Sequence, residues 1–227
     1  MNLQYFGHSF FKISFGKTNV LIDPYISHDS GPKNFERLVK CPVKETDIKK
    51  VDAIFISNES FDHCDKKILD YFVKRDSCAV ISHESILSDI NVPQHLKKAV
   101  GVNERFSFRD ISFEILPAHC PSYFYPLGLV LRKDGESIFF AGDTTLTDYS
   151  SFVKANIAAF PIGGSITMDV IDAVKATKSM KPDYVIPMHY NTFDLIKADP
   201  NDFKARIEKS ILKTEAVILK AGQSFKY

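Results

Sequence analysis

Short apolar segments rich in β-forming residues recur along the whole chain, and this pattern constrains the fold more than any other feature of the sequence. Three stretches between them carry apolar residues at helical spacing, which predicts helices over Asp65–Arg75, Val170–Met180 and Asn201–Leu212. This alternation predicts an α/β fold. The apolar segments, each about one strand long, are Asn19–Ile22, Ala53–Ser57, Ala79–Ser82, Ser137–Phe140, Ile157–Ile162, Tyr184–Met188 and Ala216–Leu219.

Two further stretches have the alternating pattern of antiparallel hairpins. They are the first twenty or so residues and the segment Glu104–Gly142, where turn-forming pairs such as Asp134-Gly135 separate the apolar runs. Hairpins followed by strand–helix units therefore occur twice along the chain. We expect two similar halves, each a mixed sheet with helices on its outer face. No linker divides the chain, so we expect a single domain over residues 1–227.

Charge and cysteine usage limit the partners and the compartment. The 29 basic and 28 acidic residues give a net charge of +1, which offers no electrostatic reason for a nucleic acid or an anionic membrane as partner. We expect a small-molecule substrate. The segment MNLQYFGHSFFKISFG lacks the basic region and cleavage site of a secretory signal. The four cysteines form no CxxC pair, which is typical of reduced thiols in a cytoplasmic protein.

Histidines and acids follow four of the predicted strands at the point where each strand ends. Residues just past the carboxyl ends of strands gather at one edge of an α/β sheet, where ligands bind. We therefore expect these side chains to converge. They are Asp62 and His63 after Ala53–Ser57, His119 after Ile115–Ala118, Asp143 after Ser137–Phe140, and His189 after Tyr184–Met188.

Imidazoles and carboxylates that converge on one point make a site for a divalent metal. Neutral imidazole suits zinc, iron or manganese, and carboxylates neutralise the charge of the ion. Without a metal, Asp62 and Asp143 would repel each other in a half-buried cleft. The alternative for any single histidine is a hydrogen-bonded core residue, but scattered core histidines do not gather at strand exits. The grouping favours the metal site.

Five segments in this order and spacing resemble the metallo-β-lactamase superfamily: GHSFFKI, LIDPYIS, AGDTTL, PIGGSITM and PMHYNTF. More narrowly, they resemble its branch of small bacterial and archaeal metal-dependent hydrolases, which includes ascorbate-phosphate lactonase relatives. The similarity runs from Phe6 to the end of the chain. It implies an αββα sandwich of two mixed sheets, with a metal site at one edge.

The resemblance also implies a loop of pattern His-x-His-x-Asp-His, from which this chain departs. Asn58 and Ser60 stand where the two leading histidines belong, whereas Asp62 and His63 match. In the family, the leading pair and a later histidine, here His119, hold a first metal. The resemblance assigns the second metal to the residues matched by Asp62, His63, Asp143 and His189.

An amide and a hydroxyl are weaker ligands than imidazole. We therefore expect one divalent ion (Zn, Mn or Fe) and no tightly bound second one. His119 is either a ligand or a hydrogen-bond donor beside the site. Cys64 and Cys120 follow His63 and His119 and are alternative ligands, but adjacent residues seldom point the same way and small buried thiols are common.

Other residues have a functional and a structural interpretation. Asp23 either orients a ligand histidine or forms a turn ahead of Pro24. His8 either lines the cleft as a substrate contact or acid, or is an edge-strand histidine. Gly164 either brings a backbone amide to an anionic group or makes a tight turn into the helix that begins near Thr167. Tyr190 and Asn191 are expected to line the pocket.

Two functions follow from these expectations. The first is a hydrolase that uses a metal-activated water on a lactone, amide or phosphodiester, with Asp62 assisting proton movement and His8 as a further catalytic candidate. The second is a degenerate, non-catalytic member of the family that binds a small ligand or a partner in the same cleft. The loss of two imidazoles at Asn58 and Ser60 motivates the second. The retained acids and histidines favour the first.

Overall fold

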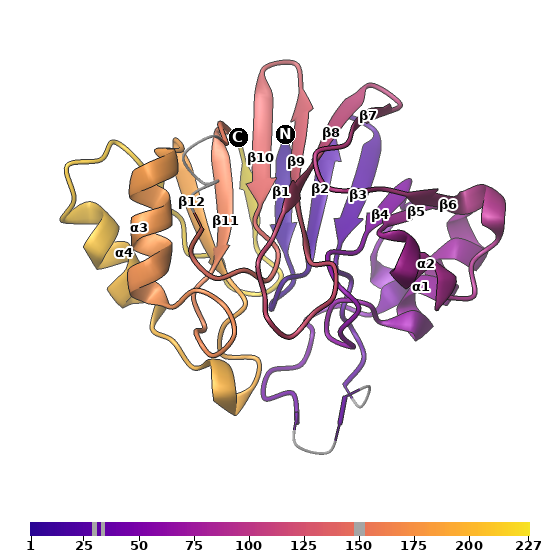
Figure 1. Cartoon of the computed structure of the whole chain (residues 1–227), viewed down its shortest axis with the longest axis horizontal. Helices are drawn as coiled ribbons and strands as arrows, with labels where there is room; N and C mark the ends of the chain where they lie inside the picture. Colours follow the sequence, from indigo (N-terminus) through magenta and orange to yellow (C-terminus); the bar gives the residue numbers. More distant parts are fainter. Residues whose placement is uncertain (29–30, 33–34, 148–152) are drawn as a thin grey trace.

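The described residues of the computed structural model form two mixed sheets that pack face to face, with helices outside both (Figure 1). The structure describes residues 1–28, 31–32, 35–147 and 153–227. The first sheet has the strand order β14-β1-β2-β3-β4-β5-β6 and the second β13-β12-β11-β10-β9-β8-β7. This arrangement confirms the predicted sandwich of two mixed sheets.

Each sheet has an antiparallel part and a parallel part, which meet at β3 and β10. The first sheet comprises β1 (Asn2–Tyr5), β2 (Phe11–Phe15), β3 (Thr18–Ile22), β4 (Ala53–Phe55), β5 (Ala79–Ser82), β6 (Lys97–Ala99) and β14 (Ser224–Lys226). The second comprises β7 (Arg105–Phe108), β8 (Ile111–Pro117), β9 (Leu127–Lys133), β10 (Glu136–Phe140), β11 (Ile157–Pro161), β12 (Tyr184–Met188) and β13 (Glu215–Ala216). The predicted repetition of hairpins and strand–helix units is confirmed by this topology.

Helices cover the parallel parts of both sheets. Figure 1 shows α1 and α2 beside β4, β5 and β6, with α3 and α4 at the opposite outer side beside β11 and β12. They are α1 (Lys66–Asp76), α2 (Glu84–Ser88), α3 (Val170–Met180) and α4 (Pro200–Glu208), and short 3-10 turns span η1 (Glu45–Asp47), η2 (Gln94–Leu96) and η4 (Asp194–Ile196). None of the helices in the described part of the chain has the length and apolar character to cross a membrane.

The core follows from the alternation of side chains along the strands. Val20 and Phe55 point between the two sheets, whereas Leu21 and Ile54 point to the opposite face and pack with the apolar side of α1. A strand in the parallel part is thus apolar on both faces, because it has the second sheet on one side and a helix on the other. This is why these segments appear in the sequence as continuous apolar runs.

The helix predictions are confirmed for α1 and α3, and the last helix ends earlier than expected. Asp65 and Asp169 cap α1 and α3 through their side chains. The prediction over Asn201–Leu212 was wrong beyond Glu208, because the Ser210 hydroxyl donates to the Ile207 carbonyl and turns the chain. Ile211 consequently lies fully in solvent rather than on the buried face.

The predicted strand Ala216–Leu219 was wrong beyond Ala216. β13 ends there, and Leu219 is buried in the core without belonging to the ladder. The chain then turns at Gly222, which has a φ of +95°. An apolar run can therefore reflect burial of a loop segment as well as a strand.

Candidate metal centre

Four buried side chains from distant parts of the chain bring their ligand atoms within 4.8 Å of one another: His8, Asp62, His63 and His189. His8 lies in the turn between β1 and β2, Asp62 and His63 follow β4, and His189 follows β12. The first sheet contributes three of these residues and the second sheet contributes one. The packing of the two sheets therefore builds the cluster.

Asp143, which follows β10, adds a carboxylate to the cluster and contacts the imidazoles of His63 and His189. Its Oδ2 lies 3.1 Å from Nε2 of His63 and its Oδ1 lies 3.2 Å from Nε2 of His189. All four of these atoms are buried, and none has a hydrogen-bond partner among the described residues. Buried polar atoms without partners cost free energy, and an ion coordinated between them satisfies two imidazoles and a carboxylate together. The donor set therefore fits a divalent transition metal.

Asp23 fixes the orientation of the His63 ring. Its Oδ2 lies 2.7 Å from Nδ1 of His63, and the backbone N–H and hydroxyl of Ser57 donate to the same carboxylate at 2.7 and 2.6 Å. Nδ1 is thereby engaged, which leaves Nε2 of His63 to face Asp143. This is the usual arrangement of a carboxylate behind a ligand histidine.

Asp62 is held by two neighbours, His8 and Ser60. Its Oδ2 lies 3.0 Å from Nε2 of His8, and its Oδ1 accepts a hydrogen bond from the Ser60 hydroxyl. Asn58 closes the loop, because its Oδ1 accepts the backbone N–H of Ser60 at 2.9 Å. The residues at the two positions where the family pattern has histidines thus bond within the loop.

Three residues of this region adopt left-handed backbone conformations that residues other than glycine rarely take. The φ angles are +56° at His8, +46° at Asp23 and +53° at His189. The N–H of His189 donates to the carbonyl of His8 at 2.8 Å, which ties the two strained positions together. Strain of this kind persists where the surrounding structure holds it in place, and it concentrates at functional sites.

The charges of the cluster are strongly coupled. Burial alone lowers the pKa of His63, but the carboxylates of Asp143 and Asp23 outweigh burial and hold that pKa well above its usual value. Burial alone raises the pKa of Asp143, but the imidazoles of His189 and His63 hold it well below its usual range. Burial lowers the pKa of His8 to about 3, with His189 adding to the effect. His8 is therefore neutral at physiological pH.

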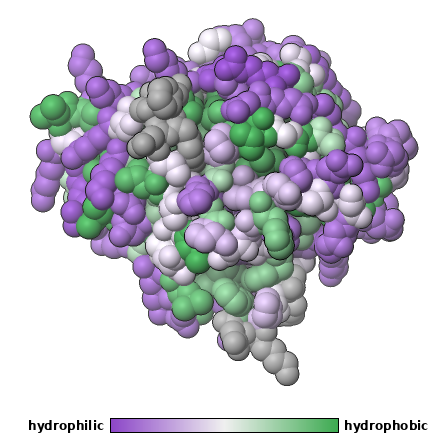
Figure 2. Space-filling model, in the orientation of Figure 1, coloured by the Kyte–Doolittle hydropathy of each residue, from purple (hydrophilic) through white to green (hydrophobic). Residues whose placement is uncertain are grey.

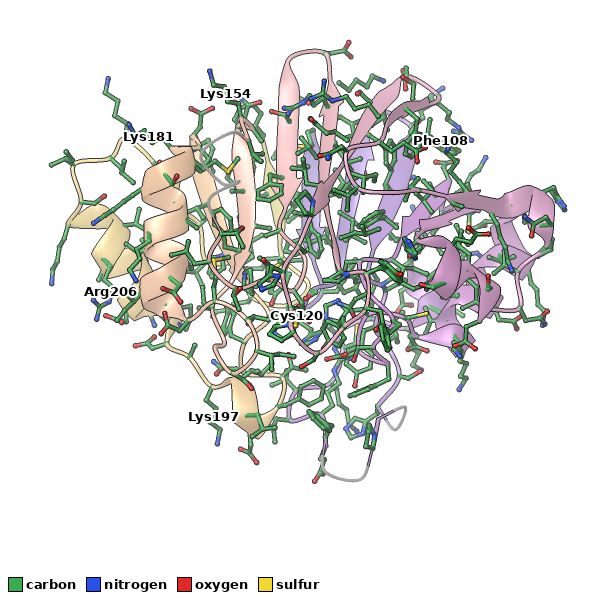
Figure 3. All side chains as sticks on the ribbon, in the orientation of Figure 1. Phe108, Cys120, Lys154, Lys181, Lys197 and Arg206 are labelled. Atoms are coloured by element: carbon green, nitrogen blue, oxygen red, sulfur yellow. The ribbon has the colours of Figure 1, made fainter. Side chains whose placement is uncertain are left out.

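His119 and the neighbouring cysteines lie outside this cluster. The His119 side chain is exposed, and its backbone contacts Thr144 and Thr145 just past Asp143. Cys120, labelled at the lower centre of Figure 3, lies among the loops below the two sheets. Burial raises the pKa of Cys64 to about 12 and that of Cys120 to about 11, so both thiols stay protonated at neutral pH.

Gly164 makes a turn, which is the structural interpretation of this residue. Its N–H donates to the Met168 carbonyl at 3.0 Å, so this amide is already used, and α3 begins at Val170. The neighbouring Gly163 packs directly against the site. A Cβ added there would lie 2.3 Å from the carbonyl oxygen of His189.

Tyr123 is a residue of the site that the sequence reasoning missed. Burial raises its pKa, and the carboxylates of Asp143 and Asp62 raise it further, so the hydroxyl stays protonated beside Ser60. It belongs to the loop between β8 and β9, four residues past His119. The only signal in the sequence was its place in the loop that follows a strand exit.

Tyr190 and Asn191 follow His189 and line a cavity of about 410 Å³, and His8 is also part of its wall. The Asn191 side chain bonds both backbone groups of Ala198 at 3.0 Å and so braces the loop after β12. Figure 2 shows apolar residues at the lower edge of the molecule, where these loops lie. Leu38, Val39 and Leu195 are exposed large apolar residues of this kind.

Comparison with known proteins identifies the family. Residues 2–189 match the family model described as the β-lactamase superfamily domain. The chain is 33% identical to a UPF0173 metal-dependent hydrolase of Staphylothermus marinus, over 99% of this chain and 98% of the relative.

Two solved structures share the architecture. A novel metallo hydrolase of Ignicoccus hospitalis superposes with a TM-score of 0.84 at 27% identity, covering 100% of this chain and 98% of that one. An isothiocyanate hydrolase from Delia radicum gut bacteria also gives a TM-score of 0.84, at 15% identity with coverage of 100% and 99%, and shows the fold alone. The chain belongs to the β-lactamase superfamily and, within it, to a family of metal-dependent hydrolases.

Proposed function

We propose that the chain hydrolyses a lactone, amide or phosphodiester with a single divalent ion (Zn, Mn or Fe) held by Asp62, His63, Asp143 and His189. The supporting observation is the set of buried atoms that face one another without hydrogen bonds: Nε2 of His63, Nε2 of His189 and both oxygens of Asp143. An ion bound there supplies Lewis acidity, which acidifies water and polarises a carbonyl or phosphoryl group.

The residues around the ion have distinct roles in this proposal. The hydrogen bond from His8 and the charge of His63 lower the pKa of Asp62 despite burial, so Asp62 is ionised and is the proposed acceptor of a proton from the attacking water. His8 is neutral, so it positions Asp62 through Nε2 rather than acting as a cationic acid. Tyr123 keeps its proton and is placed to donate a hydrogen bond to a substrate oxygen.

Asn58 and Ser60 support the proposal of one ion rather than two. Their side chains bond within the loop, to the Ser60 amide and to Asp62. His119 has an exposed side chain and is not among the four proposed ligands. The substrate in this proposal is a small molecule and the compartment is the cytoplasm, in keeping with the four free cysteines.

The test is metal content followed by activity. Protein purified without chelator is expected to hold about one equivalent of a transition metal by elemental analysis. His189→Ala should lose the metal and the hydrolysis of a lactone and bis-aryl phosphate panel, whereas the exposed His95→Ala should keep both. Less than about 0.2 equivalents of metal in the wild type, unchanged on reconstitution, would contradict the proposal.

The side chains of Asn58 and Ser60 form hydrogen bonds within their own loop. This observation also favours a second candidate function, a binding protein that has lost catalysis. That function predicts bound metal without turnover of any substrate in the panel. The paired substitution Asn58→His and Ser60→His distinguishes the two. It should raise the metal content toward two equivalents, and a gain of activity from zero would identify the wild type as the degenerate form.

A further inference from the structure

Arg37 is a buried cation without a carboxylate partner among the described residues. The side chain lies in the loop between β3 and η1, and the residue is 3% exposed. Its Nη1 donates to the carbonyl of Tyr25 at 2.9 Å and its Nε donates to the carbonyl of Val39 at 2.8 Å, and the Cys41 thiol is a further neighbour. No carboxylate oxygen of the described residues lies within 4 Å of the guanidinium. Its two hydrogen bonds, from Nε and Nη1, thus go to neutral carbonyl oxygens, although a guanidinium carries five N–H donors.

Arg37 lines a cavity of about 410 Å³ whose wall also includes His8, and we term it the arginine cavity. Lys40 and Lys220 also line it, and no acidic residue is among the described residues that do. Both lysines are exposed, and no ion pair with a described residue engages either of them. The cavity therefore has positive charge at its wall and no negative charge to neutralise it.

The arginine cavity is close to the reacting centre. The guanidinium carbon of Arg37 lies 4.2 Å from the centre of the Tyr25 ring, and that ring also packs against the His8 ring at 5.8 Å between centroids. Tyr190 also lines the cavity and contributes a phenol hydroxyl to its wall. The volume lies within the range of small-molecule sites.

We infer that the arginine cavity binds an anionic group, a carboxylate or a phosphate, of the substrate whose other end reaches the metal centre. Guanidinium recognises both groups through paired charge-assisted hydrogen bonds. Lys40 and Lys220 attract the anion at the rim, where their charges are solvated. This inference rests on the proposed hydrolase, and it narrows the substrate class to acids and phosphate monoesters that also carry a hydrolysable bond.

Anion binding can be measured without turnover. Inorganic phosphate and succinate, titrated separately into the metal-loaded protein at low ionic strength, are expected to bind in calorimetry and to raise the Tm. The tighter of the two identifies the group. The paired substitution Lys40→Glu and Lys220→Glu should weaken binding at least about tenfold, and Arg37→Gln about tenfold to a hundredfold.

The control carries the same charge change at a distance. Lys154→Glu with Lys181→Glu alters two exposed lysines that Figure 3 shows at the upper left, at the far end of the sheets from the loops around Cys120. This pair should leave phosphate binding unchanged within about twofold. Arg37→Lys keeps the positive charge and should retain part of the affinity for the anion. This variant therefore tests the inference even if Arg37→Gln fails to fold.

Two results overturn the inference. One is binding of neither anion by the wild type. The other is phosphate binding that is unaffected in the Lys40 and Lys220 pair but lost in His189→Ala, which places the anion on the metal itself. Failure of the proposed function gives a different result. The protein then holds no metal, but the arginine cavity is intact and phosphate still binds there.

Discussion

The Nδ1 nitrogen of His63 lies 2.7 Å from a carboxylate oxygen of Asp23, and this contact decides which ring nitrogen of His63 faces Asp143. Asp23 is fully buried and is itself held by the backbone and the hydroxyl of Ser57. The metal centre therefore depends on a residue that follows β3 and does not belong to the cluster of ligand atoms.

Asp23→Asn should weaken metal binding about 10- to 100-fold, because the amide cannot hold His63 with the same charge and tautomer. The measurement is competition for zinc against a chelator of known affinity. Asp52→Asn is the matched control, since Asp52 is also a buried aspartate but pairs with Arg109. It should lower the Tm and leave zinc affinity unchanged; equal losses of zinc affinity in both variants would show a general effect of stability.

Metal binding should release a proton and strengthen as the pH rises. In the metal-free fold the pKa of His63 is held well above its usual value by Asp143 and Asp23, so the ring carries a proton that a bound ion must displace. Affinity should therefore fall up to about tenfold per pH unit below that pKa and level off above it. Calorimetry in buffers of different ionisation enthalpy counts the protons released. A pH-independent affinity would mean that His63 is already neutral in the metal-free protein.

Gly163→Ala should disrupt the site through the backbone. The added Cβ would lie 2.3 Å from the His189 carbonyl oxygen and 2.8 Å from the Ile196 Cβ, neither of which is the end of a flexible side chain. We expect a loss of about 1–3 kcal/mol in the free energy of unfolding together with reduced metal content. Gly101→Ala has open space around it and should change stability by less than about 1 kcal/mol. Urea denaturation and elemental analysis of both variants make the comparison.

The early end of α4 can be tested with two apolar residues. Phe203 is fully buried, and Phe203→Ala should cost about 3–5 kcal/mol of unfolding free energy. Ile211 is fully exposed, so Ile211→Ala should change stability by less than about 0.5 kcal/mol. A loss of more than about 1 kcal/mol of unfolding free energy in Ile211→Ala would contradict the early end of α4 and support the longer helix that the sequence pattern predicted.

The site residues that directly follow strands were predictable, because the apolar pattern of a strand and the residue after it can both be read from a short stretch of sequence. The apolar runs Ala53–Ser57 and Tyr184–Met188 identified these strands, and Asp62, His63 and His189 follow them in sequence. The place of His8 was harder to predict. It enters the ligand group through a left-handed turn and a backbone bond to His189 from the other sheet, and neither is encoded near residue 8.

Arg37 and Tyr123 show a second limit. Arg37 is buried with its guanidinium over the Tyr25 ring, and an arginine between Glu36 and Leu38 gives no sign of burial in the sequence. Tyr123 approaches Asp62 and Asp143 from a loop whose shape depends on both sheets. Strands β6 and β14 were missed for a related reason, since Lys97–Ala99 and Ser224–Lys226 lie at sheet edges and need no apolar pattern.

The pairing of β14 with β1 has a consequence for folding during synthesis. Residues 2–99 supply six strands of the first sheet, but the seventh comes from Ser224–Lys226. At a translation rate of about 5–20 residues per second, the free edge of β1 waits roughly 6 to 25 seconds for its partner. An open strand edge is a template for association with other chains. The edge of β1 in the nascent protein therefore stays unpaired until the three-residue strand Ser224–Lys226 has been synthesised.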